Sequence, residues 1–353
     1  MAKLEIAVQR VAKSRITEVD FGNLPFGTIF SDHMLVADYA KGEWDEPRVV
    51  PFGPMPLSPA ASALHYGQSI FEGFKAFRLN DGNVALFRVA DNLARMQRSA
   101  ARLAMPELDA PAFIHGIVEL VRQDREWVPR TEGSSLYIRP VYFATEETLL
   151  VRPATSYRFA VMTCPVGPYF SEPLRLVAEE TYVRAFPGGT GFTKAAGNYA
   201  GSLLAAREAQ AKGFHSVVWL DGPTRQYVEE SGLMNIFFVV GGVAVTPPLG
   251  GTILPGVTRD SVLTLLREMG VPVAERAIPM SELAEAHKGK QLSEAFAVGT
   301  AATVAPIESI RYRECDIRLA LDKKTSMAER VRARLEAIRT GQETDRHGWL
   351  LRV

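Results

Sequence analysis

A short proline-rich stretch near the middle of the chain constrains the fold more than any other feature. Residues 164–173 contain three prolines and one glycine in ten positions, a composition typical of a connection between compact units. The full chain has 353 residues, which is enough for two domains of ordinary size. The sequence therefore predicts an N-terminal domain over residues 1–164, a connection over 165–176 and a C-terminal domain over 177–353.

The N-terminal domain has the strand and helix patterns of an α/β fold. Asp81-Gly82 separates two apolar segments, and this dipeptide tolerates the positive φ of a tight turn, so the flanking segments should pair antiparallel. Asp91 can cap a helix that ends at Pro106, and Pro111 can begin a second helix. The predicted strands occupy residues 73–79, 84–88, 136–143 and 157–163.

The C-terminal domain also mixes strands with helices. Gly241-Gly242 separates two strand patterns and should join them as a hairpin. The predicted strands occupy residues 216–221, 226–230, 234–240, 243–246 and 295–298. The predicted helices are residues 203–212 before Gly213, a helix capped by Thr258 that ends at Gly270, and a surface helix around Val331, Leu335 and Ile338.

Charge and cysteine content argue against several classes of function. Lys plus Arg and Asp plus Glu number 40 each, so no net field attracts nucleic acid or a membrane surface, and a small-molecule ligand is expected. Cys164 and Cys315 are the only cysteines and lie far apart, so neither a disulfide framework nor a metal site is predicted. The first ten residues carry charge every few positions, and no later apolar run is long enough to span a bilayer, so the sequence predicts a cytoplasmic protein.

Lys194 lies in a glycine-rich segment that could bring its amine to a carbonyl group. Gly191 precedes it and Gly197 follows it, and Tyr199 lies a little further along the chain. A lysine that forms a Schiff base must reach a carbonyl, and a nearby hydroxyl stabilises the imine. Most lysines in glycine-rich loops are only solvated, so this segment taken alone allows both interpretations.

Glu230 is a candidate for the carboxylate that an aldehyde cofactor with a pyridine ring needs near its ring nitrogen. It ends a predicted strand at 226–230, so the sheet can aim its side chain inward. A carboxylate in that position would keep the ring protonated and able to accept electrons. Glu229 should point to the opposite face as a solvated acid, and a solvated acid at a strand end is also the alternative for Glu230.

Three further places could bind the phosphate of such a cofactor. Residues 254–258 lead into a helix N-terminus, whose free N–H groups favour an anion. Residues 299–302 form a turn of small side chains, where N–H groups could approach phosphate or a carboxylate. Arg88 could reach the same phosphate from the N-terminal domain, because guanidinium matches phosphate oxygens bidentately. Each place also has an ordinary explanation as a cap, a turn or a surface arginine.

Seven segments carry a family resemblance that covers most of the chain. They are residues 64–77, 86–88, 136–140, Lys194 with 197–199, Glu230 with 234–235, 254–259 and 299–301. In this order they resemble the branched-chain-amino-acid aminotransferases, which are pyridoxal-phosphate enzymes of class IV and fold type IV. The resemblance implies a two-domain α/β (α+β type) fold with a smaller N-terminal domain, a C-terminal domain with a barrel-like β core, and an active site in the cleft between them.

The resemblance implies a role for each matching residue. Lys194 would be the catalytic lysine, bound to pyridoxal 5′-phosphate as an internal aldimine, with Tyr199 at the ring hydroxyl and Glu230 at the ring nitrogen. The residues implied for the phosphate are Arg88, Gly256, Val257, Thr258 and Thr300. Those implied for the substrate are Tyr66, Phe71, Tyr137, Arg139, Tyr169, Ala301 and Ala302, joined by Leu149 and Val151 from a neighbouring subunit.

The reaction implied by the resemblance is reversible ping-pong transfer of the amino group between L-leucine, L-isoleucine or L-valine and 2-oxoglutarate, in a homodimer. An apolar and aromatic pocket suits those side chains, and Arg139 or tyrosine hydroxyls are the candidate partners for the distal carboxylate of glutamate. Leu233 departs from the threonine of mammalian members, which leaves a carboxylate contact to backbone groups. The alternatives are a D-amino-acid aminotransferase or aminodeoxychorismate lyase of the same fold, or a non-catalytic protein that binds a phosphate metabolite.

Overall fold

The computed structural model of the protein describes residues 5–170, 172–321 and 325–353. The chain forms two compact units. Unit 1 comprises the residues up to Tyr169 together with Thr193–Ala196 and Ala337–Val353, and unit 2 comprises Phe170–Phe192 and Gly197–Glu336. Each unit contains its own sheet and helices, which confirms the predicted mixed α/β class. Within the described ranges, no helix combines the length and the apolar character needed to cross a bilayer.

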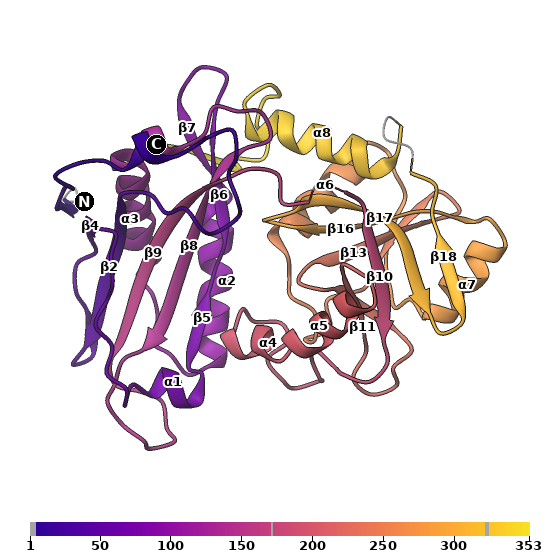
Figure 1. Ribbon diagram of the computed structural model, residues 1–353, viewed down its shortest axis with the longest axis horizontal. Coiled ribbons are helices and arrows are strands. Elements are labelled where there is room, and N and C mark those ends of the chain that lie inside the picture. The colour runs from indigo at the N-terminus through magenta and orange to yellow at the C-terminus, as the bar shows by residue number, and fades with distance from the viewer. Residues whose placement is uncertain (1–4, 171, 322–324) are drawn as a thin grey trace. The chain divides into compact units, whose positions relative to one another are not determined.

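Unit 1 is built on a mixed sheet in which the described residues form ten strands (Figure 1). The strands lie in the order β1 (Ala7–Val8), β4 (Arg48–Pro51), β2 (His33–Ala40), β9 (Tyr157–Val166), β8 (Ser135–Ala144), β6 (Phe74–Arg78), β7 (Val84–Phe87) and β19 (Leu350–Arg352), with β3 (Glu43–Trp44) beside β2 and β5 (Ser69–Phe71) beside β8. The predicted hairpin is confirmed, because β6 and β7 pair antiparallel around Gly82, which has φ of 80°.

Helices α2 (Val89–Arg102) and α3 (Ala110–Gln123) supply the helical part of the unit 1 core. Their apolar residues recur every three or four positions, so one stripe of each helix can be buried in the same core as the strand residues. Gly116 of α3 comes so close to the sheet that an added Cβ would lie 2.9 Å from Leu35. The remaining helical segments of unit 1 are η1 (Ile16–Glu18), α1 (Ser62–Tyr66) and η2 (Arg125–Trp127).

The predicted starts of these two long helices were displaced. Helix α2 begins at Val89, so Asp91 lies in its first turn, and the helix ends before Pro106. Helix α3 begins at Ala110, where the Asp109 side chain accepts a hydrogen bond from the Ala112 N–H at 3.2 Å. Asp91 was the wrong cap because the chain enters α2 through a residue in the left-handed conformation, a geometry that no preceding side chain announces.

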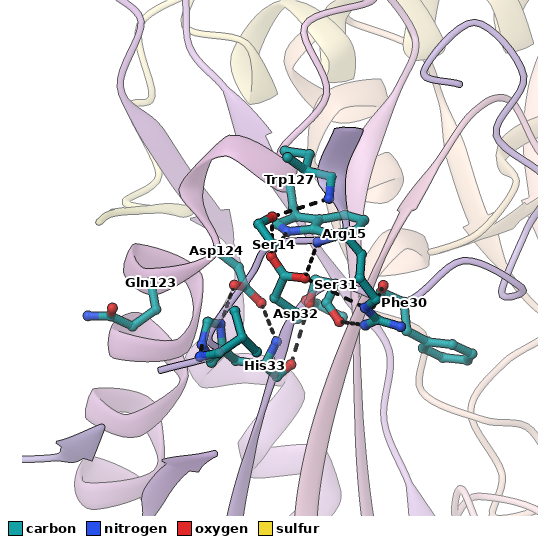
Figure 2. Close-up of polar contacts among 12 residues, drawn as sticks. Ser14, Arg15, Phe30, Ser31, Asp32, His33, Gln123, Asp124 and Trp127 are labelled. Carbon is teal, nitrogen blue, oxygen red and sulfur yellow. Dashed lines mark hydrogen bonds and ion pairs between the residues drawn. The ribbon is translucent and has the colours of Figure 1, made fainter. Parts of the chain in front are cut away.

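A buried polar cluster ties the segment around Ser14 and Arg15 to the rest of unit 1 (Figure 2). The Asp32 carboxylate accepts hydrogen bonds from Ser14 Oγ at 2.5 Å, the Arg15 N–H at 3.0 Å and Trp127 Nε1 at 2.9 Å. Burial by itself would raise the pKa of Asp32, but these hydrogen bonds and the Arg15 charge outweigh it and lower the pKa. The charged carboxylate thus fastens a segment that has little regular structure of its own.

A second buried pair lies beside this cluster (Figure 2). His33 Nδ1 lies 2.6 Å from Asp124 Oδ1, and the Val11 N–H donates to His33 Nε2 at 3.1 Å. Because Nε2 accepts a hydrogen bond, the ring proton is on Nδ1 and is donated to Asp124. The Asp32 cluster and the His33–Asp124 pair therefore both hold the segment from Val11 to Arg15 in place.

Unit 2 is built on a second mixed sheet, with nine strands in the described residues. The strands lie in the order β12 (Val228–Ser231), β11 (Ser216–Leu220), β10 (Leu174–Glu179), β17 (Thr303–Tyr312), β16 (Leu292–Gly299), β13 (Asn235–Val240), β14 (Val243–Thr246) and β15 (Val273–Glu275), with β18 (Cys315–Arg318) beside β17. The predicted Gly241-Gly242 hairpin between β13 and β14 is confirmed, and both glycines have positive φ.

Alternate residues of β13 enter two different cores. Ile236 and Phe238 pack in one core with helix α7 (Met280–Lys288), whereas Phe237 and Val239 pack in another with helix α6 (Val257–Glu268). Because successive strand residues point to opposite faces, a strand that is apolar throughout must be covered on both sides. The strand was predicted, but its burial on both faces was not.

Helix boundaries in unit 2 lie close to the predicted ones. Helix α5 (Leu203–Ala211) ends before Gly213 as predicted. Thr258 was predicted to cap α6, but it is the second residue of that helix, and Gly256 is the cap. The other helices that include unit 2 residues are α4 (Ala196–Ala200) and α8 (Met327–Arg339). In α8 the predicted apolar stripe is fully buried at Val331 and Leu335.

The units differ in extent from the predicted domains 1–164 and 177–353. The division after Tyr169 lies inside the predicted connection 165–176. The last residues of the chain, from Ala337, belong to unit 1, because β19 pairs antiparallel with β7. Thr193–Ala196 also belongs to unit 1. Both differences arise from pairing between segments that are distant in sequence, which a local change of composition cannot indicate.

Candidate active site

Lys194 belongs to unit 1, where its backbone is bonded on both sides. Its N–H donates to Ser99 Oγ at 3.0 Å, and its C=O accepts from the Phe71 N–H at 3.1 Å. The next residue, Ala195, forms an isolated antiparallel bridge with Ile70, so the lysine lies along β5. Lys194 Nζ lies 4.7 Å from the centroid of the Phe71 ring, within the range of a cation–π contact. Both the backbone and the amine of this lysine are therefore placed by β5 and its neighbours.

Four of the predicted substrate residues form one aromatic cluster in unit 1. The Arg139 guanidinium carbon lies 4.8 Å from the Phe71 ring centroid and 5.2 Å from that of Tyr137. Arg139 Nη2 also donates to the Tyr137 hydroxyl at 3.0 Å. Tyr169 joins through Phe26, whose ring lies 5.0 Å from Tyr137 and 4.8 Å from Tyr169. The cluster offers an apolar surface beside one positive charge.

Tyr66, Leu149 and Val151 form a separate, exposed group in unit 1. The Tyr66 hydroxyl donates to the Leu149 carbonyl. Leu149 and Val151 are 67% and 83% exposed, respectively, and Leu150 between them is 62% exposed, which is unusual for three consecutive large apolar residues. Tyr66 thus contacts Leu149, and all three predicted substrate residues are open to solvent.

Arg88 has the left-handed backbone conformation, with φ of 52°, at the junction of β7 and α2. Its N–H donates to the Trp349 carbonyl at 2.7 Å, and its guanidinium carbon lies 5.2 Å from the Trp349 ring centroid. Arg88 Nε donates to Asp91 at 2.8 Å, and the Arg88 side chain is 9% exposed. Residues other than glycine seldom adopt positive φ, and such strain is held only by a well-packed surrounding structure. The predicted phosphate arginine therefore has a fixed position.

Glu230 belongs to unit 2, where strand pairing fixes its backbone and polar groups surround its carboxylate. It lies opposite Trp219 in the antiparallel pair of β12 and β11. Glu230 Oε1 accepts from the Leu254 N–H at 2.7 Å, and Oε2 lies 3.2 Å from Arg184 Nε. Both members of this ion pair are almost completely buried. A buried carboxylate is tolerated when it is paired in this way, so the solvated alternative for Glu230 is wrong.

Glu229 was predicted to be a solvated acid, and that prediction is wrong. Its side chain is buried, 6% exposed, because the second face of β12 is covered as well. Burial raises the pKa of Glu229, and only part of this rise is offset by a hydrogen bond with Thr252 and by the Arg184 charge. The two adjacent carboxylates therefore have different environments. Glu230 is paired with Arg184, whereas burial raises the pKa of Glu229.

The other predicted phosphate residues lie at two turns of unit 2. Gly256 precedes α6, and Val257 and Thr258 begin it. A Cβ on Gly256 would collide with Asn235 Oδ1, so glycine allows a close approach that no other residue could make. The free N–H groups of a helix N-terminus suit an anion. Residues 300–302 (Thr300, Ala301, Ala302) form the tight turn between β16 and β17.

Tyr199 lies on α4, directly after the glycine-rich segment. Asn198 forms two hydrogen bonds with Thr190 of that segment. Its Nδ2 donates to the Thr190 carbonyl at 2.9 Å, and its Oδ1 accepts from Thr190 Oγ1 at 2.6 Å. These two bonds hold the loop before Lys194 to the helix after it. Tyr199 thus projects from a short helix whose start is fixed by its neighbours.

Sequence reasoning missed Ser99 and Arg184, which contact the two central residues. Ser99 lies 95 positions before Lys194, and Arg184 lies well before Glu230, outside any segment that carried the resemblance. Neither residue type is unusual in its local sequence. No pattern in a single sequence indicates which helix serine or which arginine folds against a distant side chain.

In the ranges that the structure describes, no group of three or more His, Cys, Asp or Glu side chains is arranged to hold a metal ion. The candidate residues comprise an amine and one aromatic cluster in unit 1, and a paired carboxylate and several N–H groups in unit 2. An amine with a paired carboxylate suits a carbonyl cofactor that carries a ring nitrogen.

The sequence and the fold are similar to those of known proteins. The family model described as Amino-transferase class IV matches residues 69–310. Branched-chain-amino-acid aminotransferase 2 of Bacillus subtilis (strain 168) is 41% identical over 357 residues, covering 100% of this chain and 98% of that protein. The branched-chain aminotransferase of Thermoproteus uzoniensis, solved with norvaline, has a TM-score of 0.77 and 28% identity, covering 91% of this chain and 99% of that chain. A branched-chain amino acid aminotransferase from T.th., solved with pyridoxamine 5′-phosphate, has a TM-score of 0.73 and 28% identity, covering 89% and 97% of the two chains.

Proposed function

The chain belongs to the class IV aminotransferase family, and on that premise we propose that it is a branched-chain-amino-acid aminotransferase dependent on pyridoxal 5′-phosphate. The observation that carries this proposal is its similarity to an enzyme of that name from Bacillus subtilis, 41% identical over the whole of this chain. The reaction is reversible transfer of the amino group between L-leucine, L-isoleucine or L-valine and 2-oxoglutarate.

The residues of each unit fit the chemistry of the proposed cofactor, and a relative solved with pyridoxamine 5′-phosphate supports the same choice. The buried carboxylate of Glu230, paired with Arg184, suits a ring nitrogen that must stay protonated. A helix N-terminus that requires glycine suits a phosphate. The residues proposed to hold the cofactor are Lys194, Arg88, Tyr199, Glu230, Gly256, Val257, Thr258 and Thr300.

Lys194 is the base in this proposal. When bound, the cofactor supplies an electron-accepting ring that stabilises negative charge on the substrate α-carbon. Lys194 Nζ would remove the substrate α-proton and return it to the carbon on the other side of the substrate nitrogen, because one base close to both carbons can serve both transfers. Glu230 keeps a proton on the ring nitrogen, and Arg184 and the Leu254 N–H orient the Glu230 carboxylate.

The aromatic cluster of unit 1 recognises the substrate side chain. Phe71, Tyr137 and Tyr169 offer a surface on which leucine, isoleucine or valine gains only burial and shape, which suits a pocket for those residues. Arg139 binds the distal carboxylate when glutamate occupies the same place. The N–H groups of Ala301 and Ala302 bind the α-carboxylate.

We also propose a homodimer in which Leu149 and Val151 complete the pocket of the other subunit. Leu64, Leu149, Leu150 and Val151 are each more than half exposed, and such a group of apolar side chains is typical of an interaction surface. Light scattering should report twice the chain mass, and Leu149→Asp should weaken both the dimer and the activity. A fully active monomer would remove this part of the proposal.

One experiment tests the function directly. The purified protein, incubated with pyridoxal 5′-phosphate, is reduced with borohydride, digested and analysed by mass spectrometry; the added mass should be on Lys194. The cofactor spectrum is then followed while L-leucine, D-alanine and 4-amino-4-deoxychorismate are added singly, and L-leucine should give the fast change. A label on another lysine, or a response to D-alanine alone, would contradict the proposal.

A further inference from the structure

Lys194 takes part in a closed ring of contacts within unit 1. Its N–H donates to Ser99 Oγ at 3.0 Å, and Ser99 Oγ donates to the Arg95 carbonyl at 3.1 Å. The Arg95 guanidinium donates to both Glu72 oxygens at 2.7 Å. Glu72 follows Phe71 in the chain, and the Phe71 N–H closes the ring on the Lys194 carbonyl at 3.1 Å. The ring therefore joins the lysine to both α2 and β5.

The residues of this ring are buried, so the loss of any one contact is costly. Ser99 and Glu72 are completely buried, and Arg95 is 3% exposed. A hydrogen bond inside a protein has no solvent competitor, and a group that loses its partner there is not rescued by water. The Arg95–Glu72 pair in particular fixes α2 against the end of β5, since breaking a buried pair is strongly unfavourable. Ser99 is thus presented to Lys194 from a rigid helix.

Ser99 has a chemical feature that suits this place. A buried serine in a helix commonly donates its hydroxyl proton to the carbonyl four residues earlier, and Ser99 does so to Arg95. The oxygen of the same hydroxyl still has acceptor capacity, and the Lys194 N–H uses it. The alternative, that Ser99 is only a back-bonded helix serine, does not account for this second bond.

Backbone contacts have to place the lysine, because its own segment is not part of a regular ladder or helix. Gly191 precedes it and Gly197 follows it, and Lys194 itself lies in no helix or strand, because α4 begins only at Ala196. Glycine is the residue with the greatest backbone freedom. A shift of this backbone would carry the amine with it, and small displacements of a catalytic group are costly for the rate.

We infer that Ser99 is a positioning residue for Lys194: its hydroxyl fixes the lysine backbone so that Nζ stays in reach of the reacting carbons. The inference rests on the proposed role of Lys194 as the catalytic lysine. Its structural part, the hydrogen bond that orders the Lys194 backbone, can be measured without cofactor or substrate.

The test compares Ser99→Ala with Ser135→Ala. Ser135 is also buried in unit 1, at 1% exposed, and its Oγ has no hydrogen-bond partner among the described residues, so it is a matched control. Backbone hydrogen exchange at Lys194 in the apoenzyme should be about tenfold faster in Ser99→Ala and unchanged in Ser135→Ala. In the loaded enzyme, Ser99→Ala should lower kcat with L-leucine by roughly 10-fold to 100-fold and leave KM within about twofold.

Each outcome decides the inference. Unchanged exchange at Lys194 in Ser99→Ala would show that the hydroxyl does not hold the backbone. Faster exchange with an unchanged kcat would reduce Ser99 to a structural residue and overturn the positioning role. Loss of the proposed function has a different signature, because Lys194→Ala would then keep its activity while the exchange result for Ser99→Ala remained.

Discussion

The amine of Lys194 in unit 1 and the carboxylate of Glu230 in unit 2 are held by different means. Lys194 lies outside regular structure, and its N–H and C=O are bonded to a helix serine and to β5. Glu230 lies inside a strand, opposite Trp219, so its backbone is fixed by the ladder and its side chain by Arg184 and the Leu254 N–H. The difference arises because Glu230 lies in a strand and Lys194 lies outside helices and strands.

A side chain on a strand already has a fixed backbone, so only its charge needs a partner. A side chain on a glycine-flanked segment needs backbone contacts first, and its charge can be met by an aromatic face, as Phe71 does for Lys194. Removing the side chain should therefore have different consequences in the two places. Removal of the Lys194 side chain should lower the catalytic rate but leave the stability of the fold almost unchanged. Removal of the Glu230 charge should lower both the rate and the stability.

The largest expected effect is that of Lys194→Ala. Transamination should fall by roughly 10³-fold or more, because the base for the proton transfer is lost. The melting temperature of the apoenzyme should stay close to that of the wild type, since the hydrogen bonds of Lys194 with Ser99 and Phe71 involve its backbone, although the contact of its amine with the Phe71 ring is lost. Stopped-flow absorbance with L-leucine and differential scanning calorimetry measure the two quantities. A large fall in melting temperature would mean that the Lys194 side chain, and not only its backbone, stabilises the fold.

Glu230→Gln should come next, with a fall in kcat of about 10²-fold, because the neutral amide no longer favours a protonated ring nitrogen. It should also lower the free energy of unfolding by about 3 kcal/mol, because Arg184 stays buried without its counter-charge. Steady-state kinetics and urea unfolding give the two values.

The matched control is Glu229→Gln, in the same strand and equally buried. Within the described ranges Glu229 forms no ion pair that the substitution would break, so the kcat of this variant should stay within about threefold of the wild type. Equal losses in both variants would mean that strand integrity, rather than the Glu230 charge, is what the kinetics report.

Glu229 also predicts a pH dependence of stability. Burial raises its pKa in the folded state above the unfolded value of about 4.3. The folded protein then holds a proton that the unfolded chain has released, so this residue's contribution is fully present below pH of about 4.3 and is lost as pH rises toward the folded pKa. In urea unfolding at a series of pH values, Glu229→Gln should become more stable relative to wild type by up to about 1.4 kcal/mol per pH unit as pH rises from about 4.3 to the folded pKa of Glu229, and the difference should stay constant above that pKa. If the unfolding free energies of the two proteins changed equally with pH, the raised pKa of Glu229 would be contradicted.

The smallest expected effect concerns Cys164, which lies opposite Tyr137 in the strand pair β8–β9. Burial raises the pKa of the Cys164 thiol to about 11, with only a partial offset from the Arg139 charge. At pH 8 the thiol should stay protonated and resist alkylation, whereas the partly exposed Cys315 should react. Peptide mapping after iodoacetamide measures both. Rapid labelling of Cys164 in the folded protein would mean that this side of the aromatic cluster admits water.

Local features of the fold were predictable from the sequence because they depend on neighbouring residues. The predicted turns at Gly82 and at Gly241-Gly242 are present with positive φ, since glycine meets little steric resistance there. Strand β14 has the predicted bounds. Helix starts were less accurate, because Arg88 enters α2 in a strained conformation that sequence does not reveal.

Much of the candidate site was not predictable in this way. Glu229 and Glu230 are adjacent and chemically identical, and strand alternation separates their faces but does not say that both faces are covered. Phe237 and Phe238 pose the same problem, since both are completely buried in different cores. Burial depends on what packs against a residue, and that partner comes from elsewhere in the chain.

By itself the sequence determined where the chain reverses, which segments alternate or follow a helical period, and the motif order that places it among the class IV aminotransferases. Only the tertiary structure decided that Ser99 holds Lys194, that Arg184 pairs with Glu230, and that the C-terminal strand returns to β7. The physical reason is separation along the chain. Propensity and periodicity act between near neighbours, whereas these contacts join residues brought together by the packing of whole sheets and helices.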